Sequence, residues 1–229
     1  MSVSSGQPAA ASSNALNEYR VVVFGSAGVG KTSLIQRFVR NEFREQYTPT
    51  VEDSYRQIIS CDNNVCTLEI IDTAGSRQFP AMQRLSIQSG HAFLLVYSVT
   101  MKTSMEELKS DMLMIRDVKK QLMPSTPMLL VANKSDSATR EVSTKLGEEV
   151  AKTWGVGFVE TSAKTNHNVR EMFVKLFDLD KARKLSLQSP MEQSLSDGGK
   201  KKKKKGKEPK PTTSTEQGGA APKKKCRLM

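Results

Sequence analysis

A glycine-rich loop between an apolar run and an amphipathic segment is the feature that most constrains this chain. The run 21–24 is followed by Gly25-Ser26-Ala27-Gly28-Val29-Gly30-Lys31-Thr32 and then by a segment with helical periodicity. Strand, loop and helix in this order form the context of a phosphate-binding loop, whose glycines let backbone amides face a pyrophosphate. An ordinary glycine turn is the alternative, but all four fixed positions of the phosphate-loop pattern are filled. The sequence therefore predicts a nucleoside triphosphate site.

Each residue type in this loop has an expected task. The Lys31 amine can reach the β- and γ-phosphates, and the Thr32 hydroxyl is placed to ligate Mg²⁺. The helix that starts near Lys31 adds its positive N-terminal end. We expect the whole stretch to contact the nucleotide: Gly25, Ser26, Ala27, Gly28, Val29, Gly30, Lys31, Thr32 and Ser33.

The positive charge of the chain is concentrated near its C-terminal end. The chain has 229 residues and a formal net charge of +11, of which residues 186–229 contribute +8 through twelve Lys and Arg against four acidic residues. Nucleic-acid-binding domains carry such charge on a folded face, so this distribution argues against a nucleic-acid partner. No apolar run approaches the roughly 20 residues of a membrane span, and no signal peptide is recognisable. The composition favours one cytosolic domain with tails.

Strands and helices alternate along residues 18–185. We expect strands at 19–24, 54–61, 65–72, 92–98, 128–132 and 158–160, and helices at 31–39, 104–122, 144–154 and 169–184. The apolar runs 92–98 and 128–132 are typical of strands covered on both faces, and Ser104 with Glu107 matches a capping box. The second and third strands read as a hairpin that holds Cys61 and Cys66 as reduced thiols. The pattern predicts an α/β P-loop NTPase fold with a mostly parallel sheet and helices on both faces.

Ligands of such sheets bind where the strands end, and a second motif lies at one of these ends. Asp72-Thr73-Ala74-Gly75 follows the third predicted strand. The Asp72 carboxylate can hold Mg²⁺ through water, and the Gly75 amide can bind a γ-phosphate. Asp-x-x-Gly is common in proteins, so this motif gains its meaning from the phosphate loop.

Two more motifs indicate which base the bound nucleotide carries. Asn133-Lys134-Ser135-Asp136 follows the fifth strand and Ser162-Ala163-Lys164 follows the last one. The Asp136 carboxylate can accept two hydrogen bonds from guanine, and the Ala163 amide could meet the guanine oxygen. Adenine lacks that donor pair, and an unpaired buried carboxylate is costly. Taken alone, the first motif could be an ordinary polar turn. Because it follows a phosphate loop, it indicates a protein that binds GTP and GDP, and not an ATP-using kinase or motor.

These motifs, in this order, resemble those of the Ras family of small GTPases over residues 18–183. The stretch Gln78–Ile87 resembles the Di-Ras branch of that family. The resemblance implies a six-stranded sheet with five helices, and a monomeric switch that binds GTP or GDP with Mg²⁺ and hydrolyses GTP. Segments 44–55 and 72–87 would change shape with the γ-phosphate. Exchange factors, GTPase-activating proteins and effectors are the implied partners.

The resemblance also assigns roles within the first of these segments and just before it. Thr50 resembles the threonine that ligates Mg²⁺ and senses GTP. Tyr47 would cover the nucleotide, and Phe43 would stack on the base. The stretch Val51-Glu52-Asp53-Ser54-Tyr55 is similar to the effector-binding segment, so effectors with a Ras-binding type of domain are expected.

The chain departs from the family where the attacking water is oriented. A glutamine directly after Asp-x-x-Gly normally does this, but here the residue is Ser76, whose hydroxyl is too short. Ala27 adds a methyl group in space used by an arginine finger, and Arg77 is either an internal finger or a solvated charge. We place the catalytic groups at Lys31, Thr50, Gly75 and Ser76 and expect slow hydrolysis. The alternative is a GTP-bound binding module that is controlled by nucleotide exchange.

The last four residues, Cys226-Arg227-Leu228-Met229, form a prenylation box whose final Met favours farnesyl, although Arg227 is not aliphatic. One lipid chain gives only marginal membrane residence, and lysines such as those at 200–205 add attraction to an anionic leaflet. A nuclear localisation signal is the alternative for the lysine run, but the cysteine box favours the membrane. We expect 1–17 and 186–229 to be disordered, with the second anchoring the protein at the cytoplasmic face of the plasma membrane.

Overall fold

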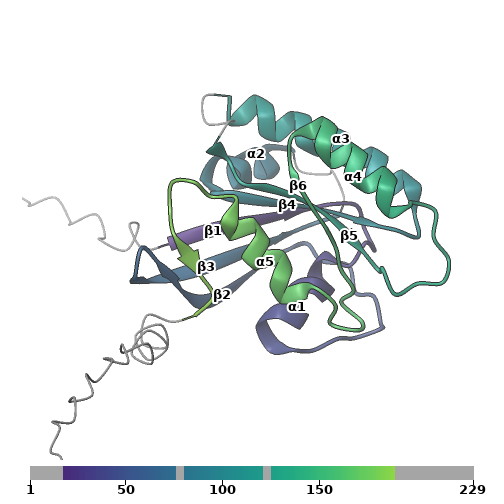
Figure 1. Ribbon diagram of the computed structural model, residues 1–229, viewed down its shortest axis with the longest axis horizontal. Coiled ribbons are helices and arrows are strands. Elements are labelled where there is room, and N and C mark those ends of the chain that lie inside the picture. The colour runs from purple at the N-terminus through teal and green to yellow at the C-terminus, as the bar shows by residue number, and fades with distance from the viewer. Residues whose placement is uncertain (1–17, 76–79, 121–124, 189–229) are drawn as a thin grey trace, which may run out of the picture.

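The computed structural model describes residues 18–75, 80–120 and 125–188. Within them, a seven-stranded sheet in the order β6-β5-β4-β1-β3-β2-β7 is flanked by helices (Figure 1). The strands are β1 (Glu18–Phe24), β2 (Glu52–Cys61), β3 (Asn64–Thr73), β4 (Ala92–Ser98), β5 (Met128–Asn133), β6 (Gly157–Glu160) and β7 (Leu185–Ser186). The helices are α1 (Lys31–Arg40), α2 (Pro80–Ser89), α3 (Lys102–Val118), α4 (Thr144–Trp154) and α5 (Val169–Asp178). This architecture confirms the predicted α/β fold with five helices, but the sheet has a seventh strand, β7, in addition to the six expected.

The sheet is parallel except for β2, which runs antiparallel to both of its neighbours, β3 and β7. β1 lies between β3 and β4, and β5 and β6 continue the parallel part, whereas β2 forms an antiparallel hairpin with β3. The register pairs Val23 with Asp72 and Ser98 with Asn133, so the loops after these strands begin at the same edge of the sheet. Cys61 and Cys66 are free thiols in the hairpin, as predicted.

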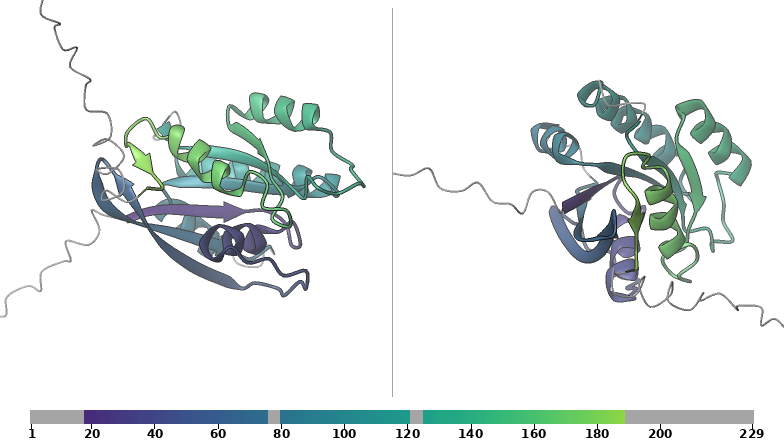
Figure 2. Two further views of the ribbon diagram at one scale, coloured as in Figure 1. Left: turned by 60° about the horizontal axis from the view of Figure 1, so that its bottom comes forward. Right: turned by 60° about the vertical axis from the view of Figure 1, so that its left-hand side comes forward.

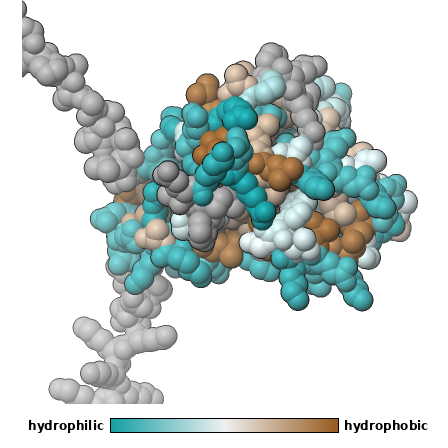
Figure 3. Space-filling model, turned by 90° about the horizontal axis from the view of Figure 1, so that it is seen from above, coloured by the Kyte–Doolittle hydropathy of each residue, from teal (hydrophilic) through white to brown (hydrophobic). Residues whose placement is uncertain are grey.

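Hydrophobic side chains fill both faces of the sheet. α1 and α5 cover one face, where the Phe38 and Phe173 rings stack with centroids 3.8 Å apart, and α2, α3 and α4 cover the other (Figure 2). β4 and β5 are buried along their whole lengths, as their apolar runs predict. The side of α3 and α4 is mainly hydrophilic with separate hydrophobic patches (Figure 3). None of the described helices has the length and apolar character needed to cross a bilayer.

The capping box predicted for α3 is wrong. The helix begins two residues earlier, and the Ser104 hydroxyl donates to the Met101 carbonyl (2.6 Å) and accepts from the Ser98 amide (3.1 Å). Ser104 therefore ties the helix to the end of β4 instead of capping it. The Glu107 carboxylate accepts a hydrogen bond from Ser26 of the glycine-rich loop.

The last helix ends earlier than its apolar pattern predicts. α5 stops at Asp178, and the Asp180 carboxylate then accepts hydrogen bonds from the amides of Ala182 (2.9 Å) and Arg183 (3.1 Å). A side-chain acceptor that binds the following amides favours a turn over a continued helix. The chain reverses here toward the β2–β3 hairpin.

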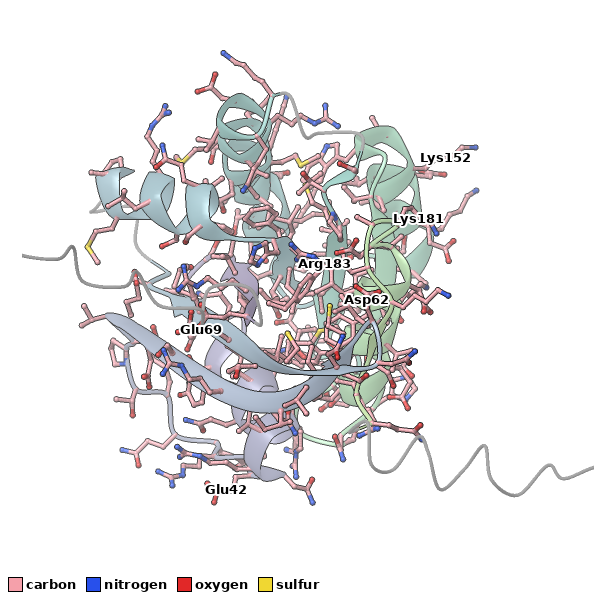
Figure 4. The ribbon with its side chains drawn as sticks, turned by 90° about the vertical axis from the view of Figure 1, so that its left-hand side faces the viewer. Glu42, Asp62, Glu69, Lys152, Lys181 and Arg183 are labelled. Atoms are coloured by element: carbon pink, nitrogen blue, oxygen red, sulfur yellow. The ribbon has the colours of Figure 1, made fainter. Side chains whose placement is uncertain are left out.

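Strand β7 extends the sheet beyond the expected end of the ordered domain at residue 185. It pairs with Ser60 and Cys61 of β2. Asp62 holds the chain just before it, because its amide donates to the Lys184 carbonyl and its carboxylate accepts from the Lys184 amide, both at 2.9 Å. Figure 4 looks onto this end of the sheet, where Asp62 and Arg183 lie near each other.

Tyr19 joins the start of β1 to the segment after α5. Its side chain is fully buried, its hydroxyl donates to the Asp180 carboxylate (2.9 Å), and the Arg183 guanidinium lies 5.3 Å from its ring centroid. His91 stacks on the same ring at 5.4 Å and accepts a hydrogen bond from the Arg20 amide. Burial lowers the pKa of His91 to about 4, so the imidazole is a neutral core-edge group.

We expect Tyr19→Phe to lower the free energy of unfolding by about 1.5 kcal/mol, because it removes a partly buried hydrogen bond to a carboxylate. Tyr97→Phe is the matched control. The Tyr97 hydroxyl is buried and has no hydrogen-bond partner among the described residues, so its loss should be neutral or stabilising. Urea unfolding at saturating GDP measures both variants, and equal losses would contradict this account.

Candidate functional site

An open pocket of about 870 Å³ lies at the edge of the sheet where the glycine-rich loop and the loops after β5 and β6 meet. The predicted nucleotide-binding residues that line it are Ala27, Gly28, Gly30, Lys31, Thr32, Ser33, Phe43, Tyr47, Thr50, Gly75, Asn133, Lys134, Asp136, Ala163 and Lys164. The other five, Gly25, Ser26, Val29, Asp72 and Ser162, each hydrogen-bond to a lining residue. The structure thus brings the predicted residues together from five separate segments.

Two glycines of the loop lie where no side chain fits. Gly25 has a φ of +146°, and a Cβ there would lie 2.1 Å from the Val96 carbonyl oxygen. Gly30 has a φ of +97°, and a Cβ would lie 2.4 Å from Nδ2 of Asn133. α1 follows at once, with no acidic residue in its first turn and no side-chain bond from its N-cap. The first-turn amides are therefore available to an anion.

Lys31 is buried at the centre of the loop. Its ammonium donates to the carbonyls of Gly25 (2.8 Å) and Ser26 (3.1 Å). Burial lowers the pKa of Lys31, while the nearby charges of Asp72 and Asp111 act in the opposite direction. A buried cation that is hydrogen-bonded to neutral carbonyls is well placed to bind phosphate oxygens.

The three predicted magnesium ligands form one cluster. The hydroxyl oxygens of Thr32 and Thr50 lie 2.9 Å apart, and the Thr32 hydroxyl donates to the Asp72 carboxylate. Asp72 is fully buried, burial raises the pKa of its carboxyl group, and its Oδ1 has no hydrogen-bond partner among the described residues. One carboxylate and two hydroxyls fit Mg²⁺, which is commonly held by one or two carboxylates together with phosphate oxygens. These three residues could therefore hold Mg²⁺ together with the phosphate oxygens of a bound nucleotide.

Asn133 joins the phosphate half of the pocket to the base half. Its side-chain amide donates to the Val29 carbonyl (2.8 Å) and accepts from the Ala163 amide (3.4 Å). The Ser162 hydroxyl donates to Asp136 Oδ1 at 2.5 Å and so orients the carboxylate. Asp136 is exposed, which corrects the expectation of a buried carboxylate. A bound base would itself shield this contact from water.

The segment after α1 forms another wall of the pocket. Phe43 is partly buried and packs against the core, while Tyr47 is 60% exposed. Residues 51–54 are exposed, so they are accessible to a partner. Tyr55, the fifth residue of the predicted effector segment, is only 7% exposed, and its side chain packs into the hydrophobic core.

Several predicted residues lie outside the described part of the chain. They are Ser76, Arg77, the beginning of the Gln78–Ile87 stretch, the lysines at 200–205 and Cys226. Gly75 precedes the gap directly.

Arg37 of α1, which was not among the predicted site residues, supports the base half of the pocket. Its guanidinium donates to the carbonyls of Ala163 (2.9 Å), Lys164 (3.1 Å) and Asn41 (2.9 Å). An arginine on an amphipathic helix ordinarily indicates a solvated face, and no local signal points to a loop more than a hundred residues away.

Comparison with known proteins shows the family of the chain. A sequence model of the Ras family matches residues 20–181. The chain is 58% identical over 173 residues to GTP-binding protein Di-Ras2 of Macaca fascicularis, a match that covers 75% of this chain and 86% of that protein. It is 56% identical over 171 residues to GTP-binding protein Di-Ras1 of Homo sapiens, with 75% and 86% covered. GTP-binding protein drn-1 of Caenorhabditis elegans is 54% identical over 173 residues, with 75% and 79% covered.

We expect Asp136→Ala to reduce the preference for GTP over ATP by roughly a hundredfold or more, because two hydrogen bonds to a charged acceptor are lost. Competitive displacement of a fluorescent guanine nucleotide by GTP and ATP measures this preference. Asp117→Ala, which removes an exposed carboxylate on α3, is the control. Equal competition by GTP and ATP in the unmodified protein would contradict the role of Asp136.

Proposed function

The chain belongs to the Ras family, and on this basis we propose that it is a membrane-anchored guanine-nucleotide switch that hydrolyses GTP slowly. The chain is a GTP-binding protein of that family, with Di-Ras proteins among its homologues. The observation that carries the proposal is the meeting of buried Lys31, the Thr32–Thr50–Asp72 cluster and the Asp136 loop around one pocket. Charge for the phosphates, a metal site and a base-reading carboxylate are what a GTP switch needs.

The described residues support a simple division of tasks. Lys31 exchanges its loop carbonyls for phosphate oxygens, and the Gly75 amide binds the γ-phosphate. The hydroxyls of Thr32 and Thr50 and the carboxylate of Asp72 would hold Mg²⁺, which neutralises charge on the phosphates when bound. Positioning and electrostatic stabilisation make up nearly all of the catalysis in phosphoryl transfer.

The switch itself is proposed to act through Thr50. This residue belongs to the magnesium cluster, and the exposed residues 51–54 follow it directly in the chain. A change at the γ-phosphate that releases Thr50 would therefore also move this exposed segment. Effectors are proposed to bind there, and exchange factors and GTPase-activating proteins to set the nucleotide state of a monomer that binds no nucleic acid.

Slow hydrolysis is proposed because serine occupies the position after Gly75. The serine side chain is too short to orient the attacking water, so stabilisation of the transition state is lost. Each tenfold loss in rate corresponds to about 1.4 kcal/mol of that stabilisation. The contacts of Lys31, Thr32 and Asp136 do not depend on this residue, so nucleotide binding is preserved. A binding module with almost no hydrolysis, controlled by exchange alone, is the limiting form of the same idea.

Ser76→Gln is expected to raise single-turnover GTP hydrolysis by about tenfold or more, and the addition of Ala27→Gly should raise it further. The glutamine supplies the missing water-orienting group. Thr153→Gln, at an exposed position on α4, controls for an added glutamine. The account of Ser76 is wrong if the unmodified protein hydrolyses GTP as fast as a glutamine-bearing relative measured alongside it.

Membrane anchoring is proposed through prenylated Cys226 and the lysines before it, at the cytoplasmic face of the plasma membrane. The exit of the chain supports this arrangement. β7 pairs with β2 beside the hairpin turn, whereas the pocket lies at the other end of β3, near Asp72. An anchor that leaves from this end allows the pocket and residues 51–54 to face away from the lipid surface.

Cys226→Ser is expected to move the protein from the membrane to the soluble fraction of cells. Neutralising the lysines at 200–205 with glutamine should weaken binding to phosphatidylserine vesicles, most clearly at low salt. Cys61→Ser, in the hairpin, is the control for loss of a cysteine. An unchanged membrane fraction for Cys226→Ser would refute the lipid anchor.

A further inference from the structure

A hydrogen bond links the glycine-rich loop to helix α3, which does not line the pocket. The Ser26 hydroxyl donates to the Glu107 carboxylate of α3, across 81 residues of sequence. From the other side, the Lys31 ammonium donates to the Ser26 carbonyl at 3.1 Å. This loop residue is therefore held through its side chain and through its backbone.

The Ser26–Ala27 peptide also lies against Gly75, which belongs to segment 72–87, the second of the two segments expected to change shape with the γ-phosphate. A Cβ on Gly75 would lie 2.4 Å from the Ala27 amide nitrogen and 2.8 Å from the Ser26 carbonyl carbon. Ser26, Gly75 and Glu107 line one small hollow between the loop, the start of the second switch segment and α3. A shift of the Ser26–Ala27 peptide would thus change both the geometry of the phosphate-binding loop and the position of Gly75.

The acceptor is part of a rigid element. Leu108, next to Glu107, is fully buried in the core, and Ser104 binds the end of β4 one turn earlier. A bond from a glycine-rich loop to such a helix restricts the loop and leaves the helix unchanged. α3 therefore acts as a fixed reference for the loop.

We propose that Glu107 is a positioning residue of the phosphate loop, which slows nucleotide release by holding the Ser26–Ala27 peptide in its binding geometry. This inference rests on GTP binding in the pocket and is independent of the hydrolysis rate. Pre-organising a loop favours the bound state because less freedom is lost on binding.

The negative charge of Glu107 would act in the opposite direction, because it repels phosphates. The two effects differ in strength. A hydrogen bond to a carboxylate belongs to the strong class, whereas the longer-range repulsion from an exposed carboxylate is screened by water and salt. The positioning effect therefore dominates, and loss of the bond speeds release.

The test measures release of a fluorescent GDP analogue from the full-length protein in the presence of Mg²⁺ and excess GDP. Ser26→Ala and Glu107→Ala should each accelerate release by roughly five- to tenfold. The double variant should be no faster than Glu107→Ala, because that variant already removes the hydrogen bond between Ser26 and Glu107. Glu107→Gln, which keeps an acceptor oxygen, should lie between Glu107→Ala and the unmodified protein.

Glu106→Ala is the matched control, because this neighbouring carboxylate faces Lys102 at 3.9 Å, and it should leave the rate unchanged. Additive effects of Ser26→Ala and Glu107→Ala, an unchanged rate in Glu107→Ala, or slower release in Glu107→Gln would each overturn the proposal. If Glu107→Ala fails to fold, Ser26→Ala and Glu107→Gln carry the same test. A failure of guanine-nucleotide binding itself would appear in the unmodified protein, so the two failures are distinguishable.

Discussion

A buried ammonium group holds the functional end of this molecule together. Burying a charge is expensive unless it is paired or hydrogen-bonded, and Lys31 meets this requirement by binding two carbonyls of its own loop. The loop therefore takes its shape around the cation. The positive N-terminal end of α1 lies at the same place, so two sources of positive potential favour a polyanionic ligand there.

The two halves of the pocket are joined by hydrogen bonds as well as by the sheet. Asn133 connects the phosphate loop at Val29 to the base loop at Ala163, and Arg37 supports the base loop from the outside of α1. Asn133 therefore contacts both halves, whereas Arg37 acts on the base half alone. The site is thus one cross-linked unit, in which hydrogen bonds connect α1 and the loops that follow β5 and β6.

Local signals in the sequence were sufficient for the fold class and for the phosphate and base motifs, whereas a fifth helix and the roles of Phe43, Tyr47 and Thr50 were expected only from the family resemblance. The buried runs of β4 and β5 and the limits of α4 follow from periodicity and composition, and the loop at 25–32 is recognisable from its spacing alone. Contacts between distant residues were not predictable in this way. Such contacts depend on which elements the fold brings together. Examples are the hydrogen bonds of Ser104 to the end of β4, the hydrogen bond of Asp62 to the chain before β7 and the hydrogen bond from Ser26 to Glu107. The exposure of Asp136 was missed for the same reason.

The close approach of the loop to its surroundings also limits how such a protein can diverge. A side chain at Gly25 would clash with the Val96 carbonyl of the backbone, and one at Gly30 would clash with the Asn133 side chain and strain a positive φ. Ser26 and Ala27 lie between them at positions that accept side chains, one half-buried and the other exposed. Gene copies can therefore vary at these two positions while the fold is retained. The lifetime of each nucleotide state can then be adjusted separately in each descendant, without redesign of the domain.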